Sequence, residues 1–68
     1  MPTIQSVIFP KDQWSLQKAR SWLKSHKYKK MEVDVKPNTY RFRQKPPTKG
    51  VKYYTVKLNN GIGLIIHN

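Results

Sequence analysis

The side chains of this chain that could do chemistry are overwhelmingly cationic. Its 68 residues include 14 Lys and Arg but only three Asp and Glu, which gives a formal net charge of +11. Such an excess adds nothing to the fold and repels itself, so it indicates a polyanionic partner. Each phosphate contact with nucleic acid releases counterions, which favours binding by a strongly basic domain. The composition therefore predicts a nucleic-acid-binding protein, and an inert basic surface is the alternative.

The cations gather in two segments, at 20–30 and at 41–52 around two prolines. The predicted nucleic-acid-binding residues are Arg20, Lys24, Lys27, Tyr28, Lys29, Lys30, Arg41, Arg43, Lys45, Lys49 and Lys52. No base-reading motif accompanies them, so we expect contacts mainly with the nucleic-acid backbone, without sequence specificity. Aromatic rings among cations can also stack on unpaired bases, which makes RNA or single-stranded DNA the alternative nucleic-acid partner.

Catalysis and metal binding have little support in the sequence. The acids are Asp12, Glu32 and Asp34, the histidines are His26 and His67, and cysteine is absent. Glu32 and Asp34 share one face of an expected strand, where they would pair with Arg43 and Arg41. The chain shows no local nucleophile signature and no phosphate-binding glycine loop. We therefore expect no enzymatic activity, no cofactor and no metal.

The elements that must position the cations follow from hydrophobic periodicity. Apolar and β-branched runs predict strands at 3–9, 31–35, 40–44, 53–58 and 62–67. A helical apolar stripe with Ser15 as N-cap predicts a helix at about 16–26. The expected fold class is α+β, with one helix packed on a mostly antiparallel sheet in the order β-α-β-β-β-β. Residues 1–68 should form a single small basic domain. The lack of a signal peptide or membrane-spanning run predicts an intracellular protein that is complete as given, without a membrane partner.

The first expected hairpin has opposite-charge pairs on one face and apolar pairs on the other. With a loop at 36–39, the pairs are Val33–Phe42, Val35–Tyr40, Asp34–Arg41 and Glu32–Arg43. The sequence leaves open whether Arg41 and Arg43 pair with these acids or bind phosphate.

The second expected hairpin turns at Asn60-Gly61, a strong two-residue turn signal. This register pairs Val56 with Ile65, Thr55 with Ile66 and Lys57 with Leu64. The last strand, apolar on both faces, should lie between the strand at 53–58 and the N-terminal strand. Ile62, Leu64 and Ile66 would then form an apolar patch on the face without the helix, which predicts a homodimer through that patch. Coverage by a loop or by the N-terminal residues is the alternative.

Two motifs resemble a known short domain. They are Trp22-Leu23-Lys24 followed by His26 and Tyr28-Lys29, and Tyr40-Arg41-Phe42-Arg43-Gln44 with Pro46, before a final stretch around Gly61-Ile62. From Trp14 to Ile66 the chain resembles a domain of phage proteins and large DNA viruses, and most of all the small basic proteins of marseillevirus-type giant viruses. The resemblance implies DNA binding in a viral factory, the host nucleus or the virion. Phage members usually append the domain to head or assembly proteins, which implies the alternative role of a structural or assembly module. They often carry Gly after the motif histidine, where this chain has Lys27, a residue less suited to a left-handed helix cap.

Overall fold

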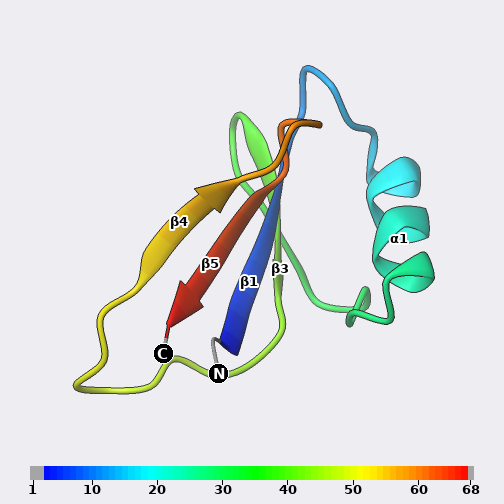
Figure 1. Cartoon of the computed structure of the whole chain (residues 1–68). Helices are drawn as coiled ribbons and strands as arrows, with labels where there is room; N and C mark the ends of the chain where they lie inside the picture. The colour runs from blue at the N-terminus through cyan, green and yellow to red at the C-terminus, as the bar shows by residue number, and fades with distance from the viewer. Residues whose placement is uncertain (1–2, 68) are drawn as a thin grey trace.

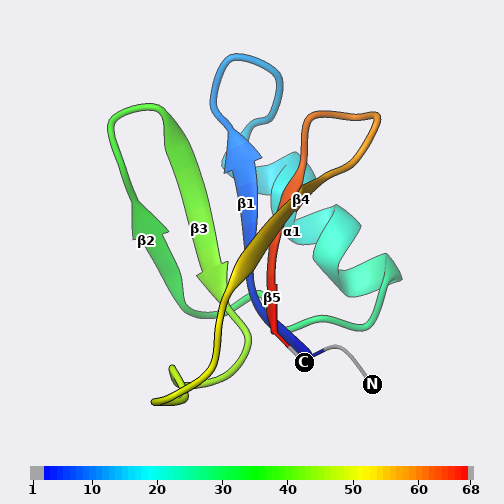
Figure 2. The same cartoon turned by 60° about the vertical axis from the view of Figure 1, so that its left-hand side comes forward.

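Alternating apolar side chains build a five-stranded sheet, and the amphipathic helix covers part of one of its faces (Figure 1 and Figure 2). The computed structural model describes residues 3–67. Its elements are β1 (Thr3–Pro10), α1 (Leu16–Ser25), β2 (Val33–Val35), β3 (Thr39–Arg43), β4 (Tyr54–Lys57) and β5 (Gly63–His67). All paired strands are antiparallel, in the order β2-β3-β1-β5-β4. The predicted α+β class and element order are confirmed, as is the place of β5 between β4 and the N-terminal strand.

The core lies between α1 and the middle of the sheet. Its fully buried apolar residues are Val7, Phe9, Ala19, Leu23, Phe42 and Ile62. The Phe9 ring meets Trp14, Trp22 and Phe42 edge to face, at centroid distances of 5.2, 5.8 and 5.6 Å. Edge-to-face packing is a preferred geometry of aromatic pairs and adds to the stabilisation from burial. These rings hold α1 over β1 and β3.

The ends of α1 follow from local hydrogen bonding. The Ser15 hydroxyl accepts from the Lys18 amide at 3.2 Å, which confirms the predicted N-cap.

No helix among residues 3–67 has the length and apolar character needed to cross a membrane.

The β2–β3 hairpin has the predicted register. Val33 lies opposite Phe42, Asp34 opposite Arg41 and Val35 opposite Tyr40. The Lys36 amide donates to the Thr39 carbonyl at 2.9 Å and closes the turn. β2 begins only at Val33, so Glu32 lies before the ladder.

The β4–β5 hairpin has a three-residue loop, and the predicted register is wrong by one residue. The Leu58 amide donates to the Ile62 carbonyl at 2.8 Å, and Gly61 between them has φ 86°. A left-handed glycine in such a loop produces a bulge that suits the strand twist. The observed pairs are Tyr54–Ile66, Thr55–Ile65, Val56–Leu64 and Lys57–Gly63.

The one-residue shift overturns the predicted dimer patch. A shift of one residue moves each side chain to the other face of the sheet. Ile62 is therefore fully buried in the core, and Leu64 packs against that core on the helix side. Ile62, Leu64 and Ile66 do not form an uncovered patch on the face away from the helix.

Candidate nucleic-acid interface

The C-terminus of α1 is built around a lysine in a left-handed conformation. Lys27 has φ 63°. Its amide donates to the Lys24 carbonyl at 3.2 Å, and the Tyr28 amide donates to the Leu23 carbonyl at 2.8 Å. These two bonds make a Schellman motif, which ends the helix and satisfies carbonyls of its last turn. The motif turns the chain sharply, so that residues 27–30 leave the helix as a basic segment.

Three aromatic rings stiffen this turn. The Trp22 ring stacks on His26 with centroids 3.9 Å apart and on Tyr28 with centroids 5.9 Å apart. The interplanar angles are 16° and 14°, so the three rings are nearly parallel. A hydrophobic contact between the residue after the left-handed position and the last helical turn often accompanies a Schellman motif. Here Tyr28 supplies that contact, and its position is fixed before any ligand arrives.

A buried glutamine joins the basic segment to the end of β3. The Gln44 side chain is 8% exposed. Its Oε1 accepts from the Lys29 amide at 2.7 Å, and its Nε2 donates to the Lys29 carbonyl at 2.9 Å and the Phe42 carbonyl at 3.3 Å. The side chain thus pairs with the Lys29 backbone as a neighbouring strand would, and it brings Lys29 and Lys30 beside Arg43 and Lys45.

A bulge in β1 holds the residues that follow β3, Gln44 and Lys45. The β1–β5 register shifts between Ile4 and Ser6, at Gln5. The Gln5 carbonyl accepts from the amides of Gln44 and Lys45 at 2.7 and 3.2 Å, and its side-chain Nε2 donates to the Lys45 carbonyl at 3.0 Å. The segment 27–30 is thus bonded to Gln44 after β3, and Gln44 and Lys45 are in turn bonded to Gln5 of β1. These bonds hold the two basic segments close together.

Three adjoining clefts bring most of the predicted binding residues together. The first cleft has a volume of about 450 Å³, and we call it the Tyr28 cleft. Its lining includes the cations Lys29, Lys30, Arg43 and Lys45 and the apolar residues Tyr28, Met31 and Pro46. Glu32 and Gln44 complete the lining. A second cleft, of about 490 Å³, shares Lys30 and adds Arg20 and Lys24. A third, of about 360 Å³, shares Tyr28, Lys29 and Lys45 and adds Lys27. We call the cations of these three clefts the basic surface: Arg20, Lys24, Lys27, Lys29, Lys30, Arg43 and Lys45.

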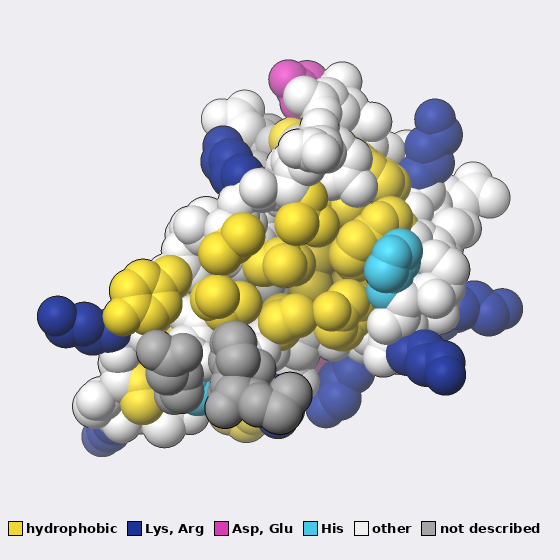
Figure 3. Space-filling model, viewed as in Figure 1, with side chains coloured by type: hydrophobic (Ala, Val, Ile, Leu, Met, Phe, Trp, Pro, Cys, Tyr) yellow, Lys and Arg dark blue, Asp and Glu magenta, His cyan; other side chains and the backbone are white. Residues whose placement is uncertain are grey.

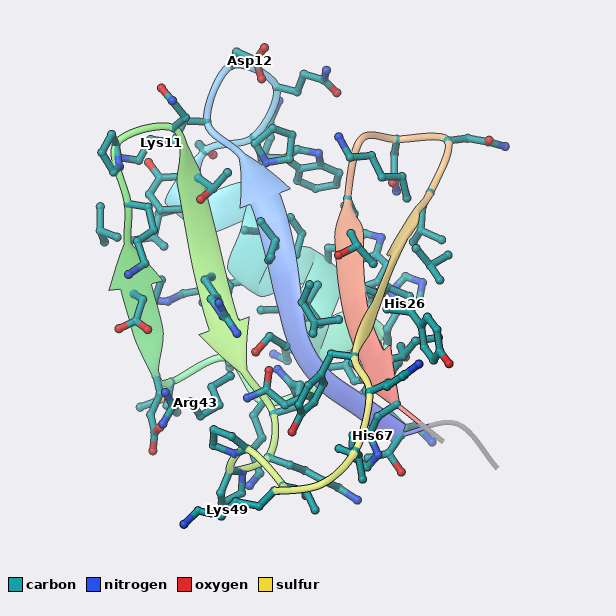
Figure 4. All side chains as sticks on the ribbon, turned by 90° about the vertical axis from the view of Figure 1, so that its left-hand side faces the viewer. Lys11, Asp12, His26, Arg43, Lys49 and His67 are labelled. Carbon is teal, nitrogen blue, oxygen red and sulfur yellow. The ribbon has the colours of Figure 1, made fainter. Side chains whose placement is uncertain are left out.

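Two acids lie beside one end of the basic surface: Glu32 and Asp34 line a fourth cleft, of about 390 Å³, together with Arg41 and Arg43. Glu32 is the one acid in the lining of the three clefts, and it forms no ion pair among residues 3–67. Asp12 lies at the end of the sheet opposite to Arg43 and Lys49 (Figure 4). No cation of the basic surface forms an ion pair with a carboxylate among residues 3–67.

The predicted charge pairs of β3 do not form. Arg41 lies opposite Asp34, but its guanidinium turns to β1 and donates to Ser6 Oγ at 3.3 Å and Gln5 Oε1 at 3.2 Å. Arg43 is exposed and forms no ion pair with Glu32. Arg41, which is half-buried and already bonded, is thus a structural residue, whereas Arg43 is available to phosphate.

Two of the predicted cations between β3 and β4 lie apart from the basic surface. Lys49 and Lys52 are exposed in the segment between β3 and β4 and line none of the three clefts. Lys49 is nevertheless at the same end of the sheet as Arg43 (Figure 4). Tyr53 closes the loop, since its hydroxyl accepts from the Thr48 amide at 2.6 Å and donates to the Thr48 carbonyl at 3.2 Å. The Tyr53 hydroxyl therefore has a structural role in this segment.

Searches against protein-family models, curated proteins and solved structures find no match to this chain.

Sequence reasoning missed Gln44 and Met31 as members of the site. Gln44 reads as the polar end of a strand, and only the long-range bonds to Lys29 show that it aligns two basic segments. Met31 was assigned to a strand, yet it lies outside β2 and is 81% exposed in the lining of the Tyr28 cleft. A large apolar residue between Lys30 and Glu32 was the available signal.

No group of three or more His, Cys, Asp or Glu that could hold a metal ion occurs among residues 3–67.

Proposed function

We propose that this chain binds DNA without sequence preference, through phosphate contacts made by the basic surface. The observation that carries the proposal is the continuity of the three clefts, which share Lys30 on one side and Tyr28, Lys29 and Lys45 on the other. Contiguous cations that lack carboxylate partners create a potential that attracts a polyanion and accelerates its association.

The origin of the cations favours backbone contacts over base reading. They come from the exposed side of α1, the turn after it and the end of β3. Flexible lysines at such positions suit phosphates, which fix a protein on nucleic acid without specifying sequence. The resemblance to small basic proteins of marseillevirus-type giant viruses supports the same proposal and suggests viral DNA as the partner.

A role as an assembly module is the second candidate, and one surface favours it. Between α1 and the β4 edge lies a wide apolar area (Figure 3), where Tyr54 is 50% and Val56 40% exposed. Apolar areas of this kind often mark protein interaction sites. If this candidate is right, a virion protein should bind the chain more tightly than DNA does, and Val56→Lys should weaken that binding.

The DNA-binding proposal is tested by mobility shift on unrelated duplexes over a range of salt concentrations. If about four to six phosphates are engaged, log affinity should fall against log salt with a slope of roughly −4 to −5. Affinity should be the same for duplexes of different sequence. Binding that does not respond to salt, or no shift at low salt, would rule the proposal out.

A charge-matched pair of triple variants locates the interface. Replacing Lys27, Lys29 and Lys30 with Ala should weaken binding and flatten the salt slope by roughly two to three units. Lys18, Lys36 and Lys57 are also exposed but lie outside the three clefts, so their replacement with Ala is the control. Equal losses in the two variants would show that net charge alone causes binding.

A further inference from the structure

The Tyr28 cleft combines cations with an apolar lining that phosphate contacts do not need. Its apolar members are Tyr28, Met31 and Pro46, and Met31 is the most exposed large hydrophobic residue of the described chain. We propose that this cleft accepts an unpaired base of single-stranded nucleic acid, while neighbouring phosphates bind the surrounding cations. This inference rests on the proposed function and adds a ligand class to it.

The aromatic wall of the cleft is held in place from behind. Tyr28 is half-buried, and its ring lies parallel to that of Trp22, which in turn stacks on His26. The backbone after Tyr28 is clamped by the two bonds between Lys29 and Gln44. A ring that is already ordered loses little freedom when a base stacks on it, which favours binding. A base in this cleft would extend a set of parallel rings that exists without the ligand.

The exposure of Met31 is explained by such a ligand. Its unbranched thioether side chain adapts to irregular apolar shapes and makes favourable contacts with aromatic rings. Next to a bound base, the 81% exposed side chain would lose contact with water. The volume of about 450 Å³ falls within the range of small-molecule sites, so one nucleotide has room beside the four cations.

The cleft should accept different bases. Gln44, the amide side chain in its lining, already uses its oxygen and its nitrogen in bonds to backbone groups. Stacking and phosphate contacts, the contacts proposed for this cleft, both tolerate a change of sequence.

An abasic oligonucleotide provides a charge-matched test. Fluorescence anisotropy at low salt compares a thymidine decamer with a decamer of abasic sites that has the same number of phosphates. The thymidine decamer should bind roughly tenfold more tightly, as expected for stacking of one base. Equal affinities would overturn the base site and leave the proposed phosphate binding intact, whereas no binding to either decamer or to duplex would overturn both. A uridine decamer that binds at least as tightly as the thymidine decamer would support the same site with RNA as the source of the base.

Two variants assign the base to this cleft. Met31→Ala should remove most of the advantage of the thymidine decamer and leave the affinity for the abasic decamer unchanged. Val35→Ala, at a 60% exposed position on β2 outside the cleft, is the matched control and should change neither affinity. Tyr28→Leu, checked by circular dichroism for folding, should have the effect of Met31→Ala. If the advantage persists in both Met31→Ala and Tyr28→Leu, the bases bind elsewhere and the assignment fails.

Discussion

At the scale of single residues, Lys27 shows how the interface depends on an unfavourable backbone conformation. A residue with a β-carbon in the left-handed region is strained, and glycine is the usual occupant of this position in a Schellman motif. Lys27 adopts φ 63° there, and its amide still makes the bond to Lys24 that ends the helix. From the sequence, Lys27 is less suited than glycine to a left-handed helix cap, and the structure places Lys27 in that conformation.

Lys27→Gly should therefore raise stability. Relief of the strain, partly offset by the greater entropy of an unfolded glycine, gives a gain of about 0.5–1 kcal/mol. Thermal unfolding followed by circular dichroism should show a rise of roughly 2–8 °C in Tm. Lys29→Gly is the control and should lower the Tm, because Lys29 does not have a positive φ. A lower Tm for Lys27→Gly would contradict the assignment of strain to this residue.

The two arginines on one face of β3 have different roles. Arg41→Ala should lower stability by about 1 kcal/mol, because it removes charge-assisted bonds to Gln5 and Ser6 from a half-buried position. Arg43→Ala should leave the Tm nearly unchanged and flatten the salt slope of DNA binding by about one unit. Parallel melting curves and mobility-shift titrations of the two variants check this contrast. A large loss of stability in Arg43→Ala would show that it has a structural partner after all.

At the scale of elements, the sequence determined one hairpin better than the other. The β2–β3 register was predictable because apolar and charged positions alternate in phase on both strands, so only one pairing satisfies both faces. The β4–β5 register was missed because Asn59-Asn60-Gly61 can close as a two-residue or a three-residue loop. The bond from Leu58 to Ile62 selects the longer one. A local turn motif cannot distinguish them when the last strand is apolar on both faces.

The candidate site was predictable in its composition but not in its arrangement. The sequence identifies its cations, yet their grouping depends on bonds between distant residues, from Gln44 to Lys29 and from Gln5 to Lys45. The choice of Arg41 between Asp34 and Gln5 likewise depends on which strand lies on the other side of β3. No pattern within 41–45 carries that information.

Gln44→Leu tests whether this junction positions the cations. The change leaves the Lys29 amide and carbonyl without their partner, which should lower the free energy of unfolding by about 2 kcal/mol in urea denaturation. DNA affinity should fall, but the salt slope should stay constant because no charge is removed. Gln13→Leu, at an exposed position before α1 that lines none of the three clefts, is the control and should change neither quantity by much. A flatter slope in Gln44→Leu would mean that phosphate contacts are lost rather than misplaced.

At the scale of the whole molecule, one short helix cannot cover five strands. Neighbouring strands are about 4.8 Å apart and a helix is about 10 Å wide, so α1 shields only about half of the sheet. The uncovered half is the helix side of β5 and β4 (Figure 3), where Val56 pairs with Leu64 and Tyr54 with Ile66. An apolar surface therefore exists, as the sequence suggested, but it is on the opposite face from the predicted one and does not include Ile62.

The exposed edge of β4 leads to a prediction of self-association. All four residues of β4 are exposed, and among residues 3–67 no strand pairs with its outer side. An antiparallel pairing of two copies about Thr55 would place Tyr54 of each copy opposite Val56 of the other and Lys57 opposite Tyr53. Aromatic–β-branched and Thr–Thr pairs are favourable across strands, and this register puts no two cations opposite each other. The strand is thus complementary to itself.

The net charge of +11 on each copy opposes this pairing, so it should appear when salt screens the repulsion. Light scattering at about 0.5 M salt should show a mass that rises toward a dimer as the protein is concentrated. Val56→Lys should keep the protein monomeric, because it places a cation within the pairing edge. Val35→Lys adds the same charge on β2, the opposite edge of the sheet, and should dimerise as the unmodified chain does. A monomeric mass at every protein concentration would rule out the β4 pairing, whereas equal loss of the dimer in the two variants would attribute the effect to charge alone.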